Sequence, residues 1–184
     1  MLNQCAPFQF GAPNGILTGR ERGGDLLEGL MGHMRKSDSE GVVPLDFSGI
    51  DFMDISCADE FLTKLIMRIG SGELGTRFVY IENANESVRE TVEAVLKLRG
   101  LAALLKDGDR VEVLGKLKTP IREALDVLLE KKEGTSTELA EALRKNVNIA
   151  CNRLNALQRM GLVCRVREGS VRGGGRQYFY ESIL

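Results

Sequence analysis

Histidine and paired cysteines are what this 184-residue chain lacks most: His33 is the single histidine, and the four cysteines form no C-x-x-C pair. Zinc sites and Ser-His-Asp or Cys-His catalytic centres need several such side chains together. The glycine-rich stretches 70–77 and 169–176 also lack the Lys-Ser/Thr ending of a phosphate-binding loop. We therefore expect no metal ion, no cofactor and no catalytic centre.

Long hydrophobic runs are missing as well. No apolar stretch approaches the ~20 residues of a membrane-spanning helix, and the first residues, MLNQCAPFQF, lack the basic-then-apolar order of a secretory signal. The widely spaced cysteines favour free thiols in a reducing compartment. With a composition that is 43% hydrophobic and 28% charged, these absences predict a globular cytoplasmic protein that does not bind membranes.

Charge is unevenly distributed, although the formal net charge is only −1. The first 119 residues hold 14 Lys and Arg against 18 Asp and Glu, whereas the last 65 hold 11 against 8. Between residues 144 and 176, eight basic residues accompany a single acid, Glu168. This asymmetry favours contact between the C-terminal end and a polyanion. A solvated basic face would give the same composition, so charge alone does not decide.

Hydrophobic periodicity alternates between strand and helix over the first 118 residues. Apolar residues recur at helical spacing in 25–34, after Ser56 and in 87–100, and strand patterns lie within 10–20, 42–56, 77–84 and 101–115. We expect 10–20 to form a hairpin or strand that turns at its Pro-Asn-Gly sequence. Ser56 is placed to cap the helix that follows it. Strands alternating with helices predict a partly parallel sheet with helices packed on it.

The stretch LDFSGIDFMDISCADEFLTKL carries a resemblance. It resembles the strand–loop–helix of STAS domains, the bacterial anti-sigma-factor antagonists, and a STAS-like module of largely unassigned function; the resemblance covers roughly residues 10–116. In the antagonists, a partner kinase phosphorylates a serine at this helix start, and Ser56 falls at the matching position. Cys57 stands where the antagonists usually have a small glycine-like residue, and Asp59 and Glu60 would repel a phosphate. A plain helix cap remains the alternative role of Ser56.

The last 65 residues predict three helices and a hairpin. Thr119-Pro120 marks the boundary, with Thr119 as a cap, and the first helix is expected to close at Gly134. A second helix begins at a Ser/Thr cap near 136, and Asn146 is expected to cap the third. The stretch LAEALRKNVNIACNRLNALQRMGLV is similar to bacterial winged helix-turn-helix domains, and the match covers 120–181. The resemblance implies that the third helix enters the DNA major groove while the hairpin rests on the flanking backbone.

The candidate DNA contacts lie on the third helix and the hairpin. Core spacing of Ala150, Leu154 and Leu157 leaves an outward face on the third helix. Asparagines on that face are suited to adenine, and glycines and arginines at a hairpin tip suit close approach to phosphate. Arg153 and Arg159 are candidates for either phosphate contact or packing. Solvent-exposed polarity and a solubilising hairpin tip are the simpler alternatives. The candidate contacts are Asn148, Cys151, Asn152, Arg153, Asn155, Arg165, Arg167, Arg172 and Arg176.

Together these patterns predict an α/β (α+β) protein with a STAS-like domain over 1–118 and a winged helix-turn-helix domain over 119–184. The function expected of that combination is DNA-binding transcriptional regulation, with double-stranded DNA as partner and a homodimer as the binding form. The first domain would then dimerise, sense a signal or dock a partner such as a histidine-kinase-like ATPase. The alternative is a protein-interaction module switched by phosphorylation of Ser56, in which the winged helix docks protein.

Overall fold

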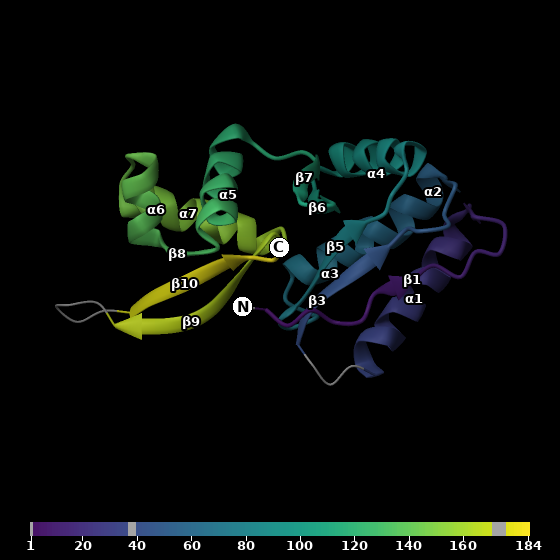
Figure 1. The fold of residues 1–184 in the computed structure, drawn as a ribbon, viewed down its shortest axis with the longest axis horizontal. Coiled ribbons are helices and arrows are strands. Elements are labelled where there is room, and N and C mark those ends of the chain that lie inside the picture. The colour runs from purple at the N-terminus through teal and green to yellow at the C-terminus, as the bar shows by residue number, and fades with distance from the viewer. Residues whose placement is uncertain (1, 37–39, 171–175) are drawn as a thin grey trace.

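The computed structural model describes residues 2–36, 40–170 and 176–184. Figure 1 shows two parts side by side, an α/β part formed by residues up to 118 and a C-terminal part formed by residues from 119 onward. The mixed α/β fold class predicted from the sequence is confirmed. Within the described residues, no helix is both long enough and apolar enough to cross a membrane.

The α/β part is built on a five-stranded sheet with the order β1-β3-β5-β6-β7. Its strands are β1 (Phe8–Gln9), β3 (Gly41–Asp46), β5 (Arg77–Glu82), β6 (Ala102–Asp107) and β7 (Arg110–Gly115). The first four run parallel, with Val43 opposite Val79, and β7 returns antiparallel to β6. Every residue of β3 is buried, as the apolar runs of parallel strands require. The partly parallel sheet and the strand–turn–strand expected within 101–115 are therefore confirmed.

Helices complete the α/β part. They are α1 (Arg20–Lys36), α2 (Ile55–Ala58), the π-helical turn η1 (Asp59–Thr63), α3 (Lys64–Gly70) and α4 (Glu86–Arg99). The consecutive α2 and η1 contact α1 on one side and α4 on the other, and α3 continues from η1. Asn85 caps α4 by accepting a hydrogen bond from the Val88 amide, and Gly100 ends it with φ 67°. The helices expected within 25–34 and 87–100 both form.

The structure decides between the two alternatives for residues 10–20 and corrects the role of Ser56. The hairpin does not form; residues 10–20 instead contain a strand, β2 (Ile16–Leu17), which pairs in parallel with β4 (Phe52–Met53). The turn before β2 does form, but the strand finds its partner far along the chain. Ser56 does not cap its helix, because it lies inside α2; Asp54 is the cap and accepts a hydrogen bond from the Cys57 amide at 2.7 Å. The helix begins two residues earlier than expected, at the stronger acceptor.

The C-terminal part contains three helices and a three-stranded sheet with the order β8-β10-β9. In chain order the elements are α5 (Thr119–Lys131), β8 (Glu133–Thr135), α6 (Ser136–Leu143), α7 (Val147–Arg159), β9 (Val163–Ser170) and β10 (Arg176–Ser182). Thr135 and Glu138 form a reciprocal capping box at α6, and Asn146 caps α7 as predicted. Two expectations are wrong: Thr119 lies within α5 rather than capping it, and Gly134 lies in β8 after the helix has ended.

The two parts share one hydrophobic core. A Cβ added at Gly161 would lie 2.7 Å from Ile69 Cγ2, and one added at Gly70 would lie 2.3 Å from the Arg159 carbonyl oxygen. Both contacts are too close for any side chain, so the C-terminal end of α7 fits directly against the end of α3. This contact determines which surfaces of α7 remain exposed.

Candidate nucleic-acid interface

One face of α7 is fixed by packing. Ala150, Leu154 and Leu157 are fully buried, and α7 contacts both α5 and α6. The Asn146 side chain accepts a hydrogen bond from the Ile149 amide at 2.9 Å and so defines where the helix starts. Since the inward face and the first residue are both fixed, the outward face is determined.

Three asparagines occupy that outward face. Asn148, Asn152 and Asn155 are exposed and follow helical spacing, and Cys151 is half-buried beside them. Within the described residues, none of the three amides has a hydrogen-bond partner. A free side-chain amide can pair with the N6 and N7 atoms of adenine in the major groove. This row of amides is the chemical feature that α7 presents to a partner.

Two apolar side chains at the start of α7 extend this surface. Val147 is 43% exposed and Ile149 is 38% exposed. Ile149 was not identified from the sequence because hydrophobic periodicity alone gives no sign that an isoleucine is exposed. Aliphatic groups of this kind suit contact with the methyl group of thymine.

Arg153 is placed inward rather than on the exposed face. Its guanidinium Nη1 lies 3.1 Å from Glu123 Oε2 of α5, and its side chain is only 10% exposed. Of the two roles considered from the sequence, this placement favours packing and not phosphate contact. Arg159 remains exposed at the end of the helix.

A bulge interrupts the alternation that strand geometry predicts for the hairpin: Arg167 lies opposite Phe179 but Arg165 lies opposite Tyr180, so the two arginines are on opposite faces. Along β9, Cys164 is buried and Val166 is half-buried, while Arg165 and Arg167 are exposed. On β10, Tyr180 is buried, and the register with β9 shifts between Phe179 and Tyr180. Arg172, the predicted contact at the hairpin tip, lies outside the described residues.

Most of the described hairpin arginines already have partners. Arg167 donates to Glu133 of β8 at 2.6 and 3.3 Å, and its guanidinium lies 3.3 Å from the centre of the Phe179 ring. The hydrogen bond from Arg167 lowers the pKa of Glu133. Arg176 pairs with Glu168 at 3.3 Å. Arg165 differs: within the described residues it stacks 4.1 Å from the Tyr178 ring but has no carboxylate partner.

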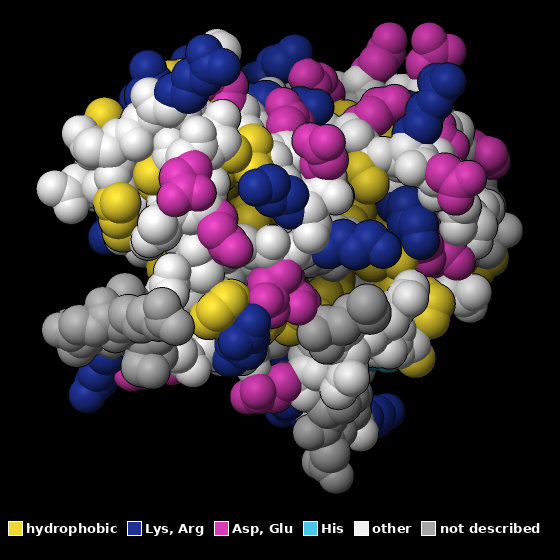
Figure 2. Space-filling view, turned by 60° about the vertical axis from the view of Figure 1, so that its left-hand side comes forward, with side chains coloured by type: hydrophobic (Ala, Val, Ile, Leu, Met, Phe, Trp, Pro, Cys, Tyr) yellow, Lys and Arg dark blue, Asp and Glu magenta, His cyan; other side chains and the backbone are white. Residues whose placement is uncertain are grey.

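The surface around these residues is of mixed charge. Figure 2 brings the C-terminal part forward and shows Lys and Arg side chains interspersed with Asp and Glu and with hydrophobic side chains, rather than gathered into one continuous basic patch. A hollow of about 400 Å³ separates the end of α7 from the α3–β5 connection, and it is lined by residues including Asn155, Arg159, Gly70 and Gly72. The far half of the asparagine row therefore faces the α/β part across this hollow, whereas Asn148 and Asn152 lie toward the other end of α7.

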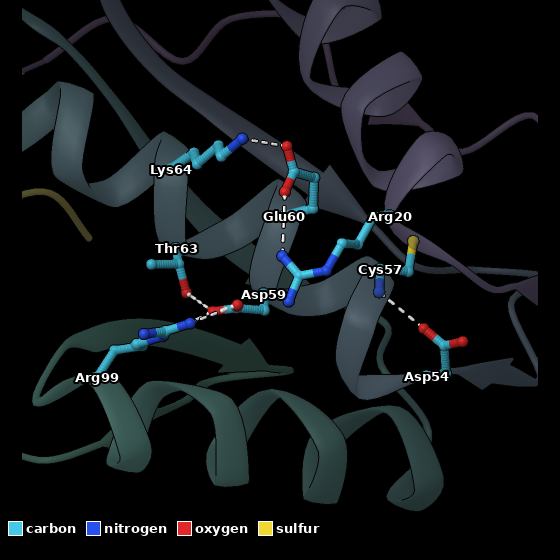
Figure 3. A network of polar contacts seen from close by, with 8 residues as sticks. All are labelled: Arg20, Asp54, Cys57, Asp59, Glu60, Thr63, Lys64 and Arg99. Atoms are coloured by element: carbon cyan, nitrogen blue, oxygen red, sulfur yellow. Dashed lines mark hydrogen bonds and ion pairs between the residues drawn. The ribbon is translucent and has the colours of Figure 1, made fainter.

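The region around Ser56 is a separate polar network, drawn in Figure 3. Asp59 accepts from Arg99 of α4 at 2.8 and 2.6 Å and from Thr63 at 3.0 Å, and the hydrogen bond from Arg99 is the main reason that the pKa of Asp59 is lowered. Burial, assisted by the charge of Asp54, raises the pKa of Cys57 to about 11.

Ser56 itself is half-buried at the second residue of α2. The Asp54 carboxylate already accepts from the amides of Cys57 and Gly19, at 2.7 and 3.0 Å. A phosphate on Ser56 would have to compete with this carboxylate for the helix start, and Asp59 adds a further negative charge nearby.

Within the residues described here, no three His, Cys, Asp or Glu side chains converge as they would around a metal ion. No protein-family model matches the chain, and a search of the curated proteins finds no match to it.

Proposed function

We propose that this chain is a DNA-binding transcriptional regulator in which α7 and the β9–β10 hairpin bind double-stranded DNA. The observation that carries the proposal is the row of exposed asparagines on α7, whose amides have no hydrogen-bond partner in the described part of the chain; the other face of this helix is fixed against α5 and α6. The chain order α5-β8-α6-α7-β9-β10 and the sheet beside the helices also fit the winged helix-turn-helix arrangement that the sequence resembles.

The dimensions suit this role. A helix of 13 residues is about 20 Å long, and the major groove is about 12 Å wide. The N-terminal half of α7, which carries Asn148 and Asn152, is the half away from the α/β part. We expect this half to meet base edges, while Arg165 on the neighbouring hairpin meets phosphate.

The ion pairs on the hairpin do not oppose DNA binding. Arg167 and Glu133 have side chains that are 54% and 34% exposed, and solvent screens the attraction in exposed pairs of this kind. A DNA phosphate can replace Glu133 as the partner of Arg167 at little cost, because it offers the same bidentate geometry.

The asparagine assignment is tested by competition between a selected duplex and random duplex. A bidentate amide–adenine pair is worth about 1–3 kcal/mol of discrimination, so Asn148→Ala and Asn152→Ala should each reduce the preference for the selected sequence by about tenfold or more. Binding to random duplex should change little. Equal loss on both duplexes would reject base contact by these residues.

The hairpin assignment is tested by salt titration. Arg165→Ala should weaken binding to all duplexes and reduce the slope of log affinity against log salt by about 1. Arg110→Ala removes an exposed arginine from the first residue of β7 and serves as the matched control. An unchanged slope for Arg165→Ala, or an equal change in both variants, would remove the hairpin from the interface.

Freeing Arg167 gives a test of opposite sign. Glu133→Gln releases the guanidinium and removes a negative charge, and should strengthen binding of every duplex at low salt. Glu130→Gln removes the same charge from an exposed position on α5 where no partner is described. A gain shared equally by both variants would reflect overall charge alone and not contact by Arg167.

For the α/β part we propose dimerisation, sensing or partner docking in the cytoplasm. A single binding unit of this size buries little DNA surface, and dimers that read two half-sites are the common solution. Sedimentation of the free and DNA-bound protein measures the stoichiometry. Two protomers on one duplex are expected, and a single protomer bound tightly to a selected site would remove the need for a dimer.

A protein-interaction module switched at Ser56 is the second candidate. Exposed apolar side chains surround the start of α2: Ile16, Phe52 and Ile55 are 45%, 43% and 58% exposed, and Ile16 pairs with Phe52 in register. Such a cluster suits a protein partner. Intact-mass measurement after co-expression with a histidine-kinase-like ATPase tests the switch. A phosphate on Ser56, together with failure to retain duplex at low salt, would favour this candidate.

A further inference from the structure

Three arginines surround a hollow on the α/β part that the proposed function does not use. The hollow measures about 260 Å³ and lies between the end of α1, the end of α3 and the start of β5. Its lining consists of Arg35, Arg68 and Arg77, the apolar side chains Met31, Met34 and Leu74, and Glu73.

The guanidinium groups here are poorly neutralised. Within the described residues, Arg35 and Arg77 have no ion-pair or hydrogen-bond partner, and Arg68 meets Glu73 only at 3.7 Å. The Nε atom of Arg77 is buried and has no hydrogen-bond partner in the described ranges of the chain. A buried donor without an acceptor costs free energy that a bound anion would recover. With Glu73 counted, the formal charge around the hollow is +2.

The apolar side chains set a second requirement on the ligand. Met34 is buried, and Met31 and Leu74 are half-buried, so one wall of the hollow is hydrocarbon and thioether. A bare inorganic anion would leave this wall in contact with water. A ligand with both an anionic head and a short apolar body would satisfy the two walls together.

We propose that this pocket binds a small phosphate monoester, with its phosphate held by Arg35, Arg68 and Arg77 and its apolar body against Met31 and Leu74. The forked donors of arginine match phosphate oxygens in pairs. A monoester carries a charge of about −1.5 to −2 at neutral pH, which balances the pocket, whereas a carboxylate would leave it positive.

The pocket shares a segment of chain with the surface described above. Glu73 and Leu74 belong to the α3–β5 connection, and Gly72 of that connection lines the hollow against Asn155 and Arg159. A ligand bound in this pocket would therefore contact the α3–β5 connection, which lies beside α7. The binding proposal itself stands without the proposed function.

Isothermal titration calorimetry of the full chain, without DNA, tests the proposal. Phenyl phosphate should bind saturably with one site per chain. Benzoate has the same phenyl ring with a carboxylate in place of the phosphate, and inorganic phosphate lacks the ring. Each should bind with an affinity at least about tenfold lower than that of phenyl phosphate. Benzoate binding as tightly as phenyl phosphate would overturn the ligand class. Equal binding of inorganic phosphate would overturn the apolar contact.

Variants locate the site. Arg77→Gln and Arg35→Gln should each weaken phenyl phosphate binding by about tenfold or more, and Arg110→Gln, at the first residue of β7, should leave it unchanged. Arg35 is exposed at the end of α1, so its variant keeps the test valid if Arg77→Gln does not fold by circular dichroism. The same affinity in Arg35→Gln and Arg110→Gln would overturn the pocket assignment.

Discussion

Arg153 has two possible roles that experiment can distinguish: contact with DNA phosphate and stabilisation of the fold. Its side chain is 10% exposed, whereas that of its partner Glu123 is 52% exposed, and the two meet at 3.1 Å. Because Glu123 stands half in water, solvent screens the attraction, and we expect a coupling of only about 0.5–1 kcal/mol. The buried stem of Arg153 also packs between α7 and α5, so Arg153→Ala should lower the free energy of unfolding by about 2 kcal/mol in total.

The assay combines urea unfolding with duplex binding. A double-mutant cycle with Arg153→Ala and Glu123→Ala, followed by circular dichroism, measures the coupling separately from the packing loss. At a temperature where Arg153→Ala remains folded, its affinity for duplex should stay within about twofold of the parent, since the charge faces inward. A loss of duplex affinity of about tenfold with an unchanged free energy of unfolding would show that Arg153 contacts phosphate, and would refute the inward placement.

Three further predictions test the contact between the parts, the pH dependence and the α7 surface. Gly161→Ala should lower the free energy of unfolding by about 1–3 kcal/mol in urea, because φ is 70° and the new Cβ would lie 2.7 Å from a neighbouring side chain; Gly32→Ala, with open space around it, should be neutral or stabilising. The lowered pKa of Asp59 means that its carboxylate stabilises the fold above the ordinary aspartate pKa of about 3.9, and that this stabilisation is lost as the pH falls through the lowered pKa. Arg99→Gln should remove this contribution to the free energy of unfolding. A stability–pH curve that is the same for Arg99→Gln and the parent would refute the role of the Asp59–Arg99 pair. Cys151, half-buried on the outward face of α7, should be the first thiol to react with a disulfide reagent in the folded protein and should be protected by bound duplex; labelling that is indifferent to duplex would argue against α7 as the interface.

The cap of α7 was predictable from the sequence because it depends on near neighbours. The side-chain oxygen of Asn146 lies three residues before the Ile149 amide whose hydrogen bond it accepts, so this cap needs no knowledge of the rest of the fold. The bulge in β9 is different: it places Arg165 and Arg167 on opposite faces, and strand periodicity alone does not reveal it. Ser56 shows the limit of this reasoning: two good acceptors stood two residues apart, and the start of the helix was decided by Asp54, which also binds the Gly19 amide 35 residues away.

Helical spacing could have predicted the inward placement of Arg153, but its charge favoured an exposed position. Residues 150, 153, 154 and 157 follow the spacing of a single buried stripe, and Arg153 belongs to that stripe by position. Its acidic partner, Glu123, lies on another helix, and no local pattern points to it. The parallel pairing of β2 with β4 was missed for the same reason, because the partner strand lies more than 30 residues along the chain.

Under the proposed function, the close fit between the two parts would limit how DNA binding and the α/β part influence one another. With Gly161 against Ile69 and Gly70 against the Arg159 carbonyl, α7 cannot rotate about its C-terminal end unless α3 moves with it, since close-packed contacts shift rather than stretch. The N-terminal half of α7 has no such contact and is the half that can enter a groove. Any event that displaces the end of α3, whether a partner at the α/β part or a ligand between Arg68 and Arg77, would therefore change the angle at which α7 is presented. Under this proposal, the contact at Gly70 and Gly161 would couple ligand or partner binding at the α/β part to DNA binding by α7.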